Sequence, residues 1–284
     1  MKKLLIVDGS NLLFQMFFGM PARITGKDGR GIWGTLGFTG ALIKIIKLTS
    51  PTHILVIFDG EHKNERTETD SEYKANRRNF SETPDEGNPF SQLFDIYSVL
   101  DFMEILHFET TDCETDDLIA AYAKKYSGEY DIIISSQDSD FFQLVGENVR
   151  ILRYRGEKTV LCDTEYVRAK TGVLPSEYAD FKCLTGDGSD NIKGIYGVGA
   201  KTAAELINTY KTLDGVVCNA GNIKKTSLRE AVLCGRERLI KNKKLIGSAA
   251  QYVFLGITAL SLLLFVLWSF NSPSIGIFTP PVNA

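Results

Sequence analysis

The sequence predicts an α/β fold with a central, mostly parallel sheet flanked by helices. Three continuous apolar runs, LLIVD, HILVIFD and DIIIS, are rich in β-branched residues and have the length of strands buried on both faces. An aspartate closes or closely follows each run: Asp8, Asp59 and Asp138. Residues 34–48, between the first two runs, have helical periodicity, so the chain should open with a β-α-β unit.

The remaining elements follow in order along the chain. Residues 60–89 are polar and end in prolines and a glycine, which predicts a surface insertion. Beyond it we expect helices at about 90–103, 115–126 and 141–144, and strands near 104–108, 131–135, 149–154 and 158–163, the last two forming a hairpin. We therefore expect an α/β domain at 1–163, a mostly helical subdomain at 164–246 and a separate tail at 247–284.

The charges are distributed unevenly along the 284 residues. The net charge is only -3, but residues 1–190 carry 21 Lys/Arg and 31 Asp/Glu, whereas residues 191–246 carry 11 Lys/Arg and 4 Asp/Glu. A protein that cuts phosphodiesters needs such a pairing, because a basic part can hold the nucleic-acid backbone while an acidic part holds metal ions.

The cysteines and histidines argue against disulfides and zinc. The five cysteines are scattered, no C-x-x-C pair occurs, and the three histidines lack zinc-ligand spacing. The N-terminal MKKLLIVDGS reads as a first strand rather than a signal peptide. We expect a cytoplasmic protein with reduced thiols, acting at the nucleoid if its substrate is DNA.

The C-terminal tail carries no charged side chain, and its residues 252–270 are long enough to span a bilayer. The basic RERLIKNKK before it would leave the rest of the chain in the cytoplasm. A core helix and a segment foreign to the original reading frame are the two alternatives, and all three stay open.

Nine carboxylates arrive in five short groups, and three of the groups follow predicted strands. Gathered carboxylates are unfavourable unless a cation lies among them, and Mg²⁺ prefers oxygen ligands. Sites in open α/β sheets form beyond the carboxyl ends of the strands. Isolated aspartates usually cap turns or helices, but that explanation does not suit five groups together. The pattern predicts a metal-dependent active site made by Asp8, Asp59, Glu114, Asp116, Asp117, Asp138, Asp140, Asp187 and Asp190.

Such a set suits two-metal phosphodiester cleavage, in which cations about 4 Å apart activate a water and stabilise the leaving oxygen. Glu114 and Asp117 should share one face of a helix start, while Asp116 points elsewhere. A phosphatase with an aspartate nucleophile would want a second aspartate at position 10, where this chain has Ser10.

Two further segments are suited to nucleic acid. In helical form, Arg66, Tyr73, Lys74 and Arg77 of the polar insertion fall near one face, which suits a single strand, although composition alone favours a solvated charged helix. The segment GIYGVGAKTAAELI at 194–207 places glycines before a helix, as in a helix-hairpin-helix that grips the DNA backbone. The P-loop pattern is absent.

Six motifs in order make the chain resemble the 5′ nuclease family. They are LLIVDGSNLLF, FD followed by R-x₆-YKANR, ETDD, SQDSDFFQL, LTGDGSDN and GIYGVGAKTA. This family contains the 5′–3′ exonuclease domain of bacterial DNA polymerase I, its stand-alone relatives and the flap endonucleases. The resemblance covers about residues 1–246, and it implies a PIN-like 5′ nuclease fold with a helical arch at about 60–89.

The resemblance implies roles for individual residues. All nine acidic residues fall on the family's metal positions, the first metal being surrounded by Asp8, Asp59, Glu114, Asp116, Asp117 and Asp138 and the second by Asp140, Asp187 and Asp190. Catalysis would rest on Asp8, Asp138 and Lys74, with Lys74 stabilising charge on the scissile phosphate. The DNA-binding set would be Arg66, Tyr73, Lys74, Arg77, Gly194, Gly197, Gly199, Lys201 and Thr202.

We therefore expect a monomeric, Mg²⁺-dependent 5′–3′ exonuclease and flap endonuclease. Mn²⁺ could substitute, and K⁺ could bind at the helix-hairpin-helix. Since no polymerase region follows the matched residues, we expect a stand-alone nuclease. The alternatives are a PIN-type ribonuclease and a DNA-junction binding protein without catalysis, and the complete acidic set argues against the second.

Overall fold

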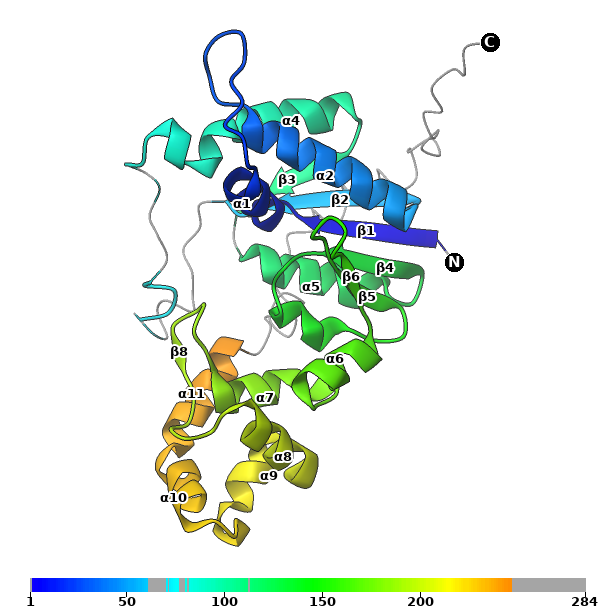
Figure 1. Ribbon diagram of the computed structural model, residues 1–284. Coiled ribbons are helices and arrows are strands. Elements are labelled where there is room, and N and C mark those ends of the chain that lie inside the picture. Colours follow the sequence, from blue (N-terminus) through cyan, green and yellow to red (C-terminus); the bar gives the residue numbers. More distant parts are fainter. Residues whose placement is uncertain are drawn as a thin grey trace.

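A six-stranded sheet forms the centre of the larger part of the molecule (Figure 1). The computed structural model describes residues 2–60, 70, 72–76, 80, 82–111 and 113–246. The strands lie in the order β3-β2-β1-β4-β5-β6, and only β6 runs antiparallel to its neighbour. Their bounds are β1 Lys2–Asp8, β2 His53–Phe58, β3 Leu106–Glu109, β4 Tyr130–Ser135, β5 Val149–Arg153 and β6 Val160–Cys162.

The register of the parallel strands brings their carboxyl ends to one edge. β1 is central, with Asp8 opposite Ile57 of β2 and Val7 opposite Ser135 of β4. Residues that follow these three strands must therefore lie next to one another, as expected for an open α/β sheet.

Helices cover both faces of the sheet because side chains alternate along each strand. Leu5 and Val7 point to a core shared with helices on one face, while Leu4 and Ile6 point to a core on the other. The first face carries α1 Gly9–Gly19, α2 Trp33–Thr49 and α4 Leu93–Phe102, and the second carries α5 Thr115–Tyr126 (Figure 1). The predicted α/β class with its mostly parallel sheet is confirmed.

Helix α1 is the main element that the sequence did not predict. Its first turn is capped by Asp8, whose side chain accepts a hydrogen bond from Asn11 N. Gly9 allows the turn from β1, because a Cβ there would lie 2.7 Å from the ring of Phe58. The predicted short helix at 141–144 is a 3₁₀ turn, η3 Asp140–Leu144, and other 3₁₀ turns are η1 Asp85–Gly87, η2 Pro89–Gln92, η4 Pro175–Glu177 and η5 Ala220–Asn222.

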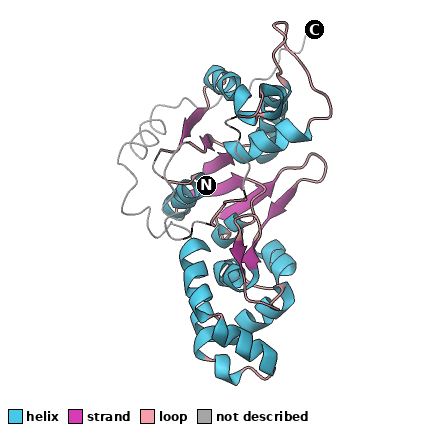
Figure 2. Cartoon of the chain, turned by 90° about the vertical axis from the view of Figure 1, so that its left-hand side faces the viewer, coloured by secondary structure: helices cyan, strands magenta, loops and turns pink. Residues whose placement is uncertain are grey.

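The C-terminal part is helical, as the periodicity predicted, and it lies beyond the α5 side of the sheet (Figures 1 and 2). Its helices are α6 Thr164–Thr171, α7 Tyr178–Thr185, α8 Ala200–Tyr210, α9 Leu213–Cys218, α10 Thr226–Cys234 and α11 Arg236–Ile246. A pair of two-residue strands, β7 Gly186–Asp187 and β8 Ile192–Lys193, was not predicted. One continuous hydrophobic core joins this part to the sheet.

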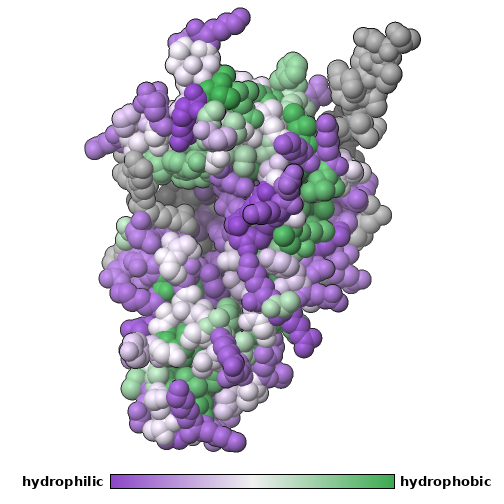
Figure 3. Space-filling view, in the orientation of Figure 1, coloured by the Kyte–Doolittle hydropathy of each residue, from purple (hydrophilic) through white to green (hydrophobic). Residues whose placement is uncertain are grey.

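Hydrophilic side chains cover most of the face shown in Figure 3, with small apolar patches between them. Within the described ranges, no helix is both long and apolar enough to cross a membrane. The candidate span at 252–270 lies outside those ranges, as do residues 61–69, 71, 77–79 and 81 of the predicted arch at 60–89.

Candidate metal-dependent active site

The carboxyl ends of β1, β2 and β4, with the aspartates that close or follow them, form what we call the acidic edge of the sheet. The aspartate that ends β1 lies at its centre. Asp8 is only 5% exposed. Its Oδ1 accepts a hydrogen bond from Asn11 N at 2.9 Å and its Oδ2 accepts one from Ser136 Oγ at 2.8 Å. The carboxylate therefore caps a helix, as the simpler interpretation held, and it also binds the loop that follows β4.

Two serines hold the loops that carry the neighbouring aspartates. Asp59 N donates to Ser10 Oγ at 2.8 Å, and Asp138 N donates to Ser136 Oγ at 3.1 Å. Each serine thus links one strand end to the next. The hydroxyl of Ser10 has a positioning role here, in place of the second aspartate that a phosphatase would require.

Four carboxylates at this edge interact strongly, and we call them the first acidic group: Asp8, Asp59, Asp116 and Asp138. Burial, together with the charge of Asp59, raises the pKa of Asp8 to about 7. Burial and the charges of Asp138 and Asp8 raise the pKa of Asp116 well above its ordinary value. Protein groups alone leave this site short of positive charge, which fits a site for a divalent cation.

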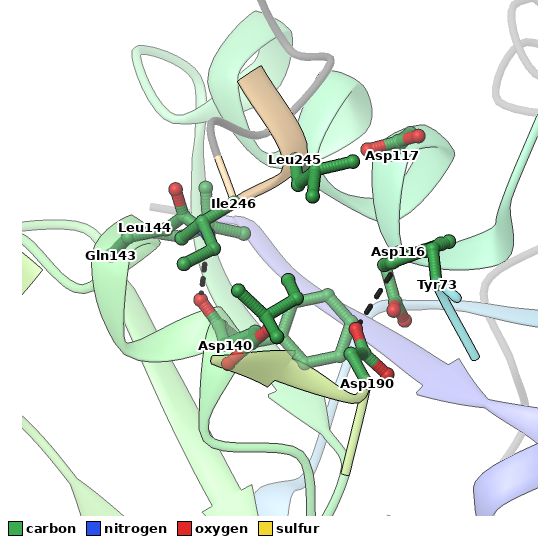
Figure 4. A pocket seen from close by; sticks show the side chains of 12 residues that line it. Tyr73, Asp116, Asp117, Asp140, Gln143, Leu144, Asp190, Leu245 and Ile246 are labelled. Atoms are coloured by element: carbon green, nitrogen blue, oxygen red, sulfur yellow. Dashed lines mark hydrogen bonds between the residues drawn. The ribbon is translucent and has the colours of Figure 1, made fainter. Parts of the chain in front are cut away.

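The start of α5 contributes three acidic residues to two different places. Asp116 and Asp117 line one pocket together with Asp140 and Asp190 (Figure 4). Glu114 instead contacts the described part of the insertion, where Lys74 Nζ lies 2.7 Å from its Oε1. Helical spacing suggested that Glu114 and Asp117 would share a face, whereas the pocket is shared by Asp116 and Asp117.

Residues 72–76, within the predicted arch, contact the acidic site. The buried hydroxyl of Tyr73 lies 3.3 Å from both Glu114 Oε2 and Asp190 Oδ2, and Figure 4 shows Tyr73 directed toward Asp190. Lys74 has a left-handed backbone with φ 54°, and its N–H donates to Asp190 O at 3.1 Å. A segment predicted to contact DNA therefore also connects Glu114, at the start of α5, with Asp190, which precedes β8. Arg66 and Arg77 lie outside the described residues.

A second acidic group consists of Asp140, Asp187 and Asp190. Each offers a carboxylate oxygen, and these oxygens all lie within 4.8 Å of one another, so the three side chains could hold a metal ion. Oδ1 of Asp140 is buried, and the cation that it faces is the ammonium of Lys182, 2.9 Å away. A buried carboxylate oxygen of this kind is suited to a cation. The resemblance implied this trio as ligands of the second metal.

Lys182 is a charged residue in this region that the sequence analysis missed. Its Nζ lies 2.9 Å from Asp140 Oδ1 and 2.5 Å from Asp187 Oδ2. Burial and Asp138 raise the pKa of Asp140 to about 6, although Lys182 opposes the shift. Burial alone would raise the pKa of Asp187, but the hydrogen bonds from Lys182 and Ser189 hold it below its ordinary value. The sequence offered one signal for this residue, because a single lysine inside the apolar run FKCL indicates a buried charge that needs a partner.

The segment between α7 and α8 that carries Gly194, Gly197 and Gly199, which we call the glycine turn, is held by close backbone contacts at its base. A Cβ on Gly194 would lie 2.3 Å from the carbonyl carbon of Thr185, and one on Gly186, whose φ is 78°, would lie 2.3 Å from Gly194 N. Asn242 of α11 is buried and donates hydrogen bonds to Cys183 O and Lys193 O. These two bonds connect α11 to α7, which leads into the hairpin formed by β7 and β8, and to β8 itself. The backbone between α7 and α8 therefore leaves no room for a side chain at the base of the turn.

The predicted DNA-contacting positions of this turn face outward. Gly197 adopts φ 75° and is exposed, as are Gly199 and Lys201, while Thr202 is half-buried. Gly199 is the N-cap of α8 and has no side chain that could cap its first turn. Backbone N–H groups at such a helix start are suited to a phosphate.

The fold and the acidic edge define a class of α/β proteins that collect carboxylates at the ends of parallel strands, next to a helical unit. Residues 3–172 match the 5′-3′ exonuclease N-terminal resolvase-like domain, and residues 173–253 match the 5′-3′ exonuclease C-terminal SAM fold. The chain belongs to the 5′-3′ exonuclease family, which confirms the resemblance seen in the sequence.

Curated relatives are whole DNA polymerases. The chain is 36% identical over 246 residues to DNA polymerase I of Borreliella burgdorferi, covering 86% of this chain and 26% of that protein. It is 32% identical over 238 residues to the thermostable DNA polymerase I of Thermus thermophilus, covering 84% of this chain and 28% of that protein. The chain thus spans about a quarter of the length of these relatives.

Solved structures share the fold at low sequence identity. The T5 5′-exonuclease with bound divalent zinc ions has a TM-score of 0.77 at 20% identity, covering 94% of this chain and 99% of that one. A bacteriophage T5 flap endonuclease complex with DNA and metal ions has a TM-score of 0.73 at 20% identity, covering 96% and 95%. The catalytic core of Rad2 with a DNA substrate has a TM-score of 0.55 at 17% identity, covering 99% and 83%.

Proposed function

We propose that this chain is a Mg²⁺-dependent 5′–3′ exonuclease and flap endonuclease that hydrolyses DNA phosphodiesters. The observation that carries the proposal is the meeting of two acidic groups at one edge of a parallel sheet, beside a closely packed glycine turn. Family membership supports the same assignment, as does the DNA bound by two of the structural neighbours, one of which also binds metal ions.

The residues divide between two metal positions. Asp8, Asp59, Glu114, Asp116, Asp117 and Asp138 would hold the first divalent ion, directly or through water, and Asp140, Asp187 and Asp190 the second. When bound, such ions lower the pKa of a water and stabilise the leaving oxygen. The hydrogen bonds to Asp8 from Asn11 N and Ser136 Oγ keep its oxygens oriented toward the site.

Lys74 and Tyr73 would act on the DNA rather than on the ions. Lys74 lies next to Glu114, so its ammonium is within reach of a phosphate bound at the acidic edge. The hydroxyl of Tyr73 holds the segment in place through Glu114 and Asp190. Arg66 and Arg77 are proposed to bind phosphates of the 5′ strand.

The glycine turn would bind the duplex part of the substrate. Gly194, Gly197, Gly199, Lys201 and Thr202 are proposed to contact its backbone, and the turn is proposed to bind K⁺. The basic stretch at 191–246 supports this role, since contacts of lysine and arginine with phosphates supply affinity without reading sequence. We further propose a catalytic domain at 1–163 and a DNA-binding subdomain at 164–246, in a monomer that acts in the cytoplasm at the nucleoid.

The choice of substrate can be tested with a branched DNA beside a single-stranded RNA. The full chain with Mg²⁺ should release a labelled 5′ flap of DNA near the junction, and it should act poorly on a single-stranded RNA of the same sequence. Preferential cutting of the RNA would favour the PIN-type ribonuclease. Membrane fractionation of the full chain beside residues 1–246 tests the tail, because equal soluble recovery would argue against an anchor.

A further inference from the structure

Lys182 lies between two members of the second acidic group. Its ammonium contacts Asp140 Oδ1 at 2.9 Å and Asp187 Oδ2 at 2.5 Å. The oxygens of Asp140, Asp187 and Asp190 that could bind a cation lie within 4.8 Å of one another. The lysine nitrogen is therefore within contact distance of two of the three carboxylates that a second divalent ion would use.

This pairing differs from the ion pairs on the surface. Lys182 is 8% exposed and Asp187 is 7% exposed, whereas the pair between Lys193 and Glu72 is largely in solvent. Phe181, Cys183 and Leu184, the neighbours of Lys182 on α7, are also buried. A buried ammonium interacts far more strongly with its carboxylates than an exposed one, and it is unfavourable to leave either partner uncompensated.

The lysine and a divalent ion would compete for the same oxygens. An ammonium supplies one positive charge and three hydrogen-bond donors, so it can neutralise the carboxylates but cannot coordinate water or a phosphate oxygen. A hard divalent ion needs several oxygens at short distance, and those of Asp140 and Asp187 already face Lys182. Binding of the ion would require the lysine to move away or to share its partners.

We propose that Lys182 is a built-in counterion of the second acidic group, which holds these carboxylates together without metal and weakens their binding of a divalent ion. The inference rests on the proposed two-metal function. It makes Lys182 a positioning residue, and it assigns the two metal positions unequal affinities in the free protein.

Titration of the metal-free full chain with Mn²⁺ alone at pH 8, followed by calorimetry, tests this inference. The wild-type chain should bind one ion tightly and a second ion weakly. In Lys182→Met, which keeps the length of the side chain and removes its charge, the second ion should bind about tenfold more tightly or better. Lys44→Met, on the exposed side of α2, makes the same change in net charge and should leave both affinities unchanged.

A purely structural lysine would give the opposite result, because its loss would disorder the carboxylates and weaken the second ion. Unchanged or weaker second-ion binding in a folded Lys182→Met protein would overturn the inference. If this variant does not fold, the wild-type chain decides, since two Mn²⁺ ions of equal affinity without DNA would contradict a built-in competitor. Flap cleavage by wild type, measured in parallel, separates this failure from a failure of the proposed function.

Discussion

At the scale of single residues, the buried carboxylates of the acidic edge lower the stability of the metal-free fold, and the same carboxylates are suited to binding cations. Asp8 is buried beside other carboxylates, and its pKa of about 7 means that its charged form is unfavourable in the metal-free fold. The same charge is what a divalent ion would require. Substitutions in this group should therefore affect stability and catalysis in opposite directions.

Asp8→Asn should abolish cleavage and stabilise the metal-free protein. The amide can still accept from Asn11 N, so the cap of α1 survives, while the loss of a buried charge should add roughly 2 kcal/mol at pH 8. The cleavage rate should fall by about a hundredfold or more, with DNA affinity changed much less. Thermal melts with EDTA and flap assays with Mg²⁺ measure the two effects. Asp28→Asn, at an exposed ion pair, should show neither.

Lys74→Ala should slow cleavage while the metal ions remain bound. The ammonium is proposed to stabilise charge on the phosphate, so its loss should lower the single-turnover rate roughly ten- to a hundredfold. Its removal also leaves Glu114 without its 2.7 Å partner, and Mn²⁺ affinity should not decrease. Calorimetry on the same preparation checks this point. A rate loss that follows a loss of bound Mn²⁺ would show that Lys74 acts through the metal site instead.

At the scale of elements, the hairpin between α7 and α8 depends on the absence of side chains at its base. Gly194→Ala would force a Cβ to within 2.3 Å of the Thr185 backbone, which cannot move as a flexible side chain would. We expect a loss of about 2 kcal/mol in the free energy of unfolding. Gly199→Ala is the matched control in the same turn, because a Cβ there meets nothing within 4 Å. Urea unfolding of both variants measures the difference, and equal stability would contradict the packing account.

Continuous apolar runs made the strands predictable, and the aspartates that follow them made the acidic edge predictable. Helix α1 was missed because GSNLLFQMFFG is apolar on nearly all sides and shows no amphipathic stripe. Strands β7 and β8 have two residues each, too few for any periodicity to show. Lys182 could not be paired with Asp140 from sequence, because 42 positions separate them and only the packing of α7 beside η3 brings them together.

At the scale of the whole molecule, stability should depend on pH and on divalent metal together. The pKa values of Asp8, at about 7, and Asp140, at about 6, lie above the ordinary value, and that of Asp116 is also raised. The folded protein therefore holds these protons more tightly than the unfolded chain does. The stability they contribute is present at low pH and is lost as pH rises through these values.

Without metal, the melting temperature should be several degrees higher at pH 6 than at pH 8, since about 1 kcal/mol corresponds to roughly 2–4 °C for a protein of this size. Mg²⁺ should raise the melting temperature more at pH 8, where the carboxylates are charged. Melts in EDTA and in Mg²⁺ at both pH values measure this linkage. A metal-free melting temperature that is the same or higher at pH 8 would contradict the assigned electrostatics.

The most direct test of the central claim is cleavage of a labelled 5′-flap DNA by the purified full chain, with binding measured on the same substrate. We predict that Mg²⁺ supports release of the flap near the junction, that EDTA abolishes release, and that Asp138→Asn still binds the DNA without cutting it. If the wild-type chain binds the flap but does not cut it with any divalent metal supplied, the nuclease assignment is contradicted and a junction-binding protein is favoured.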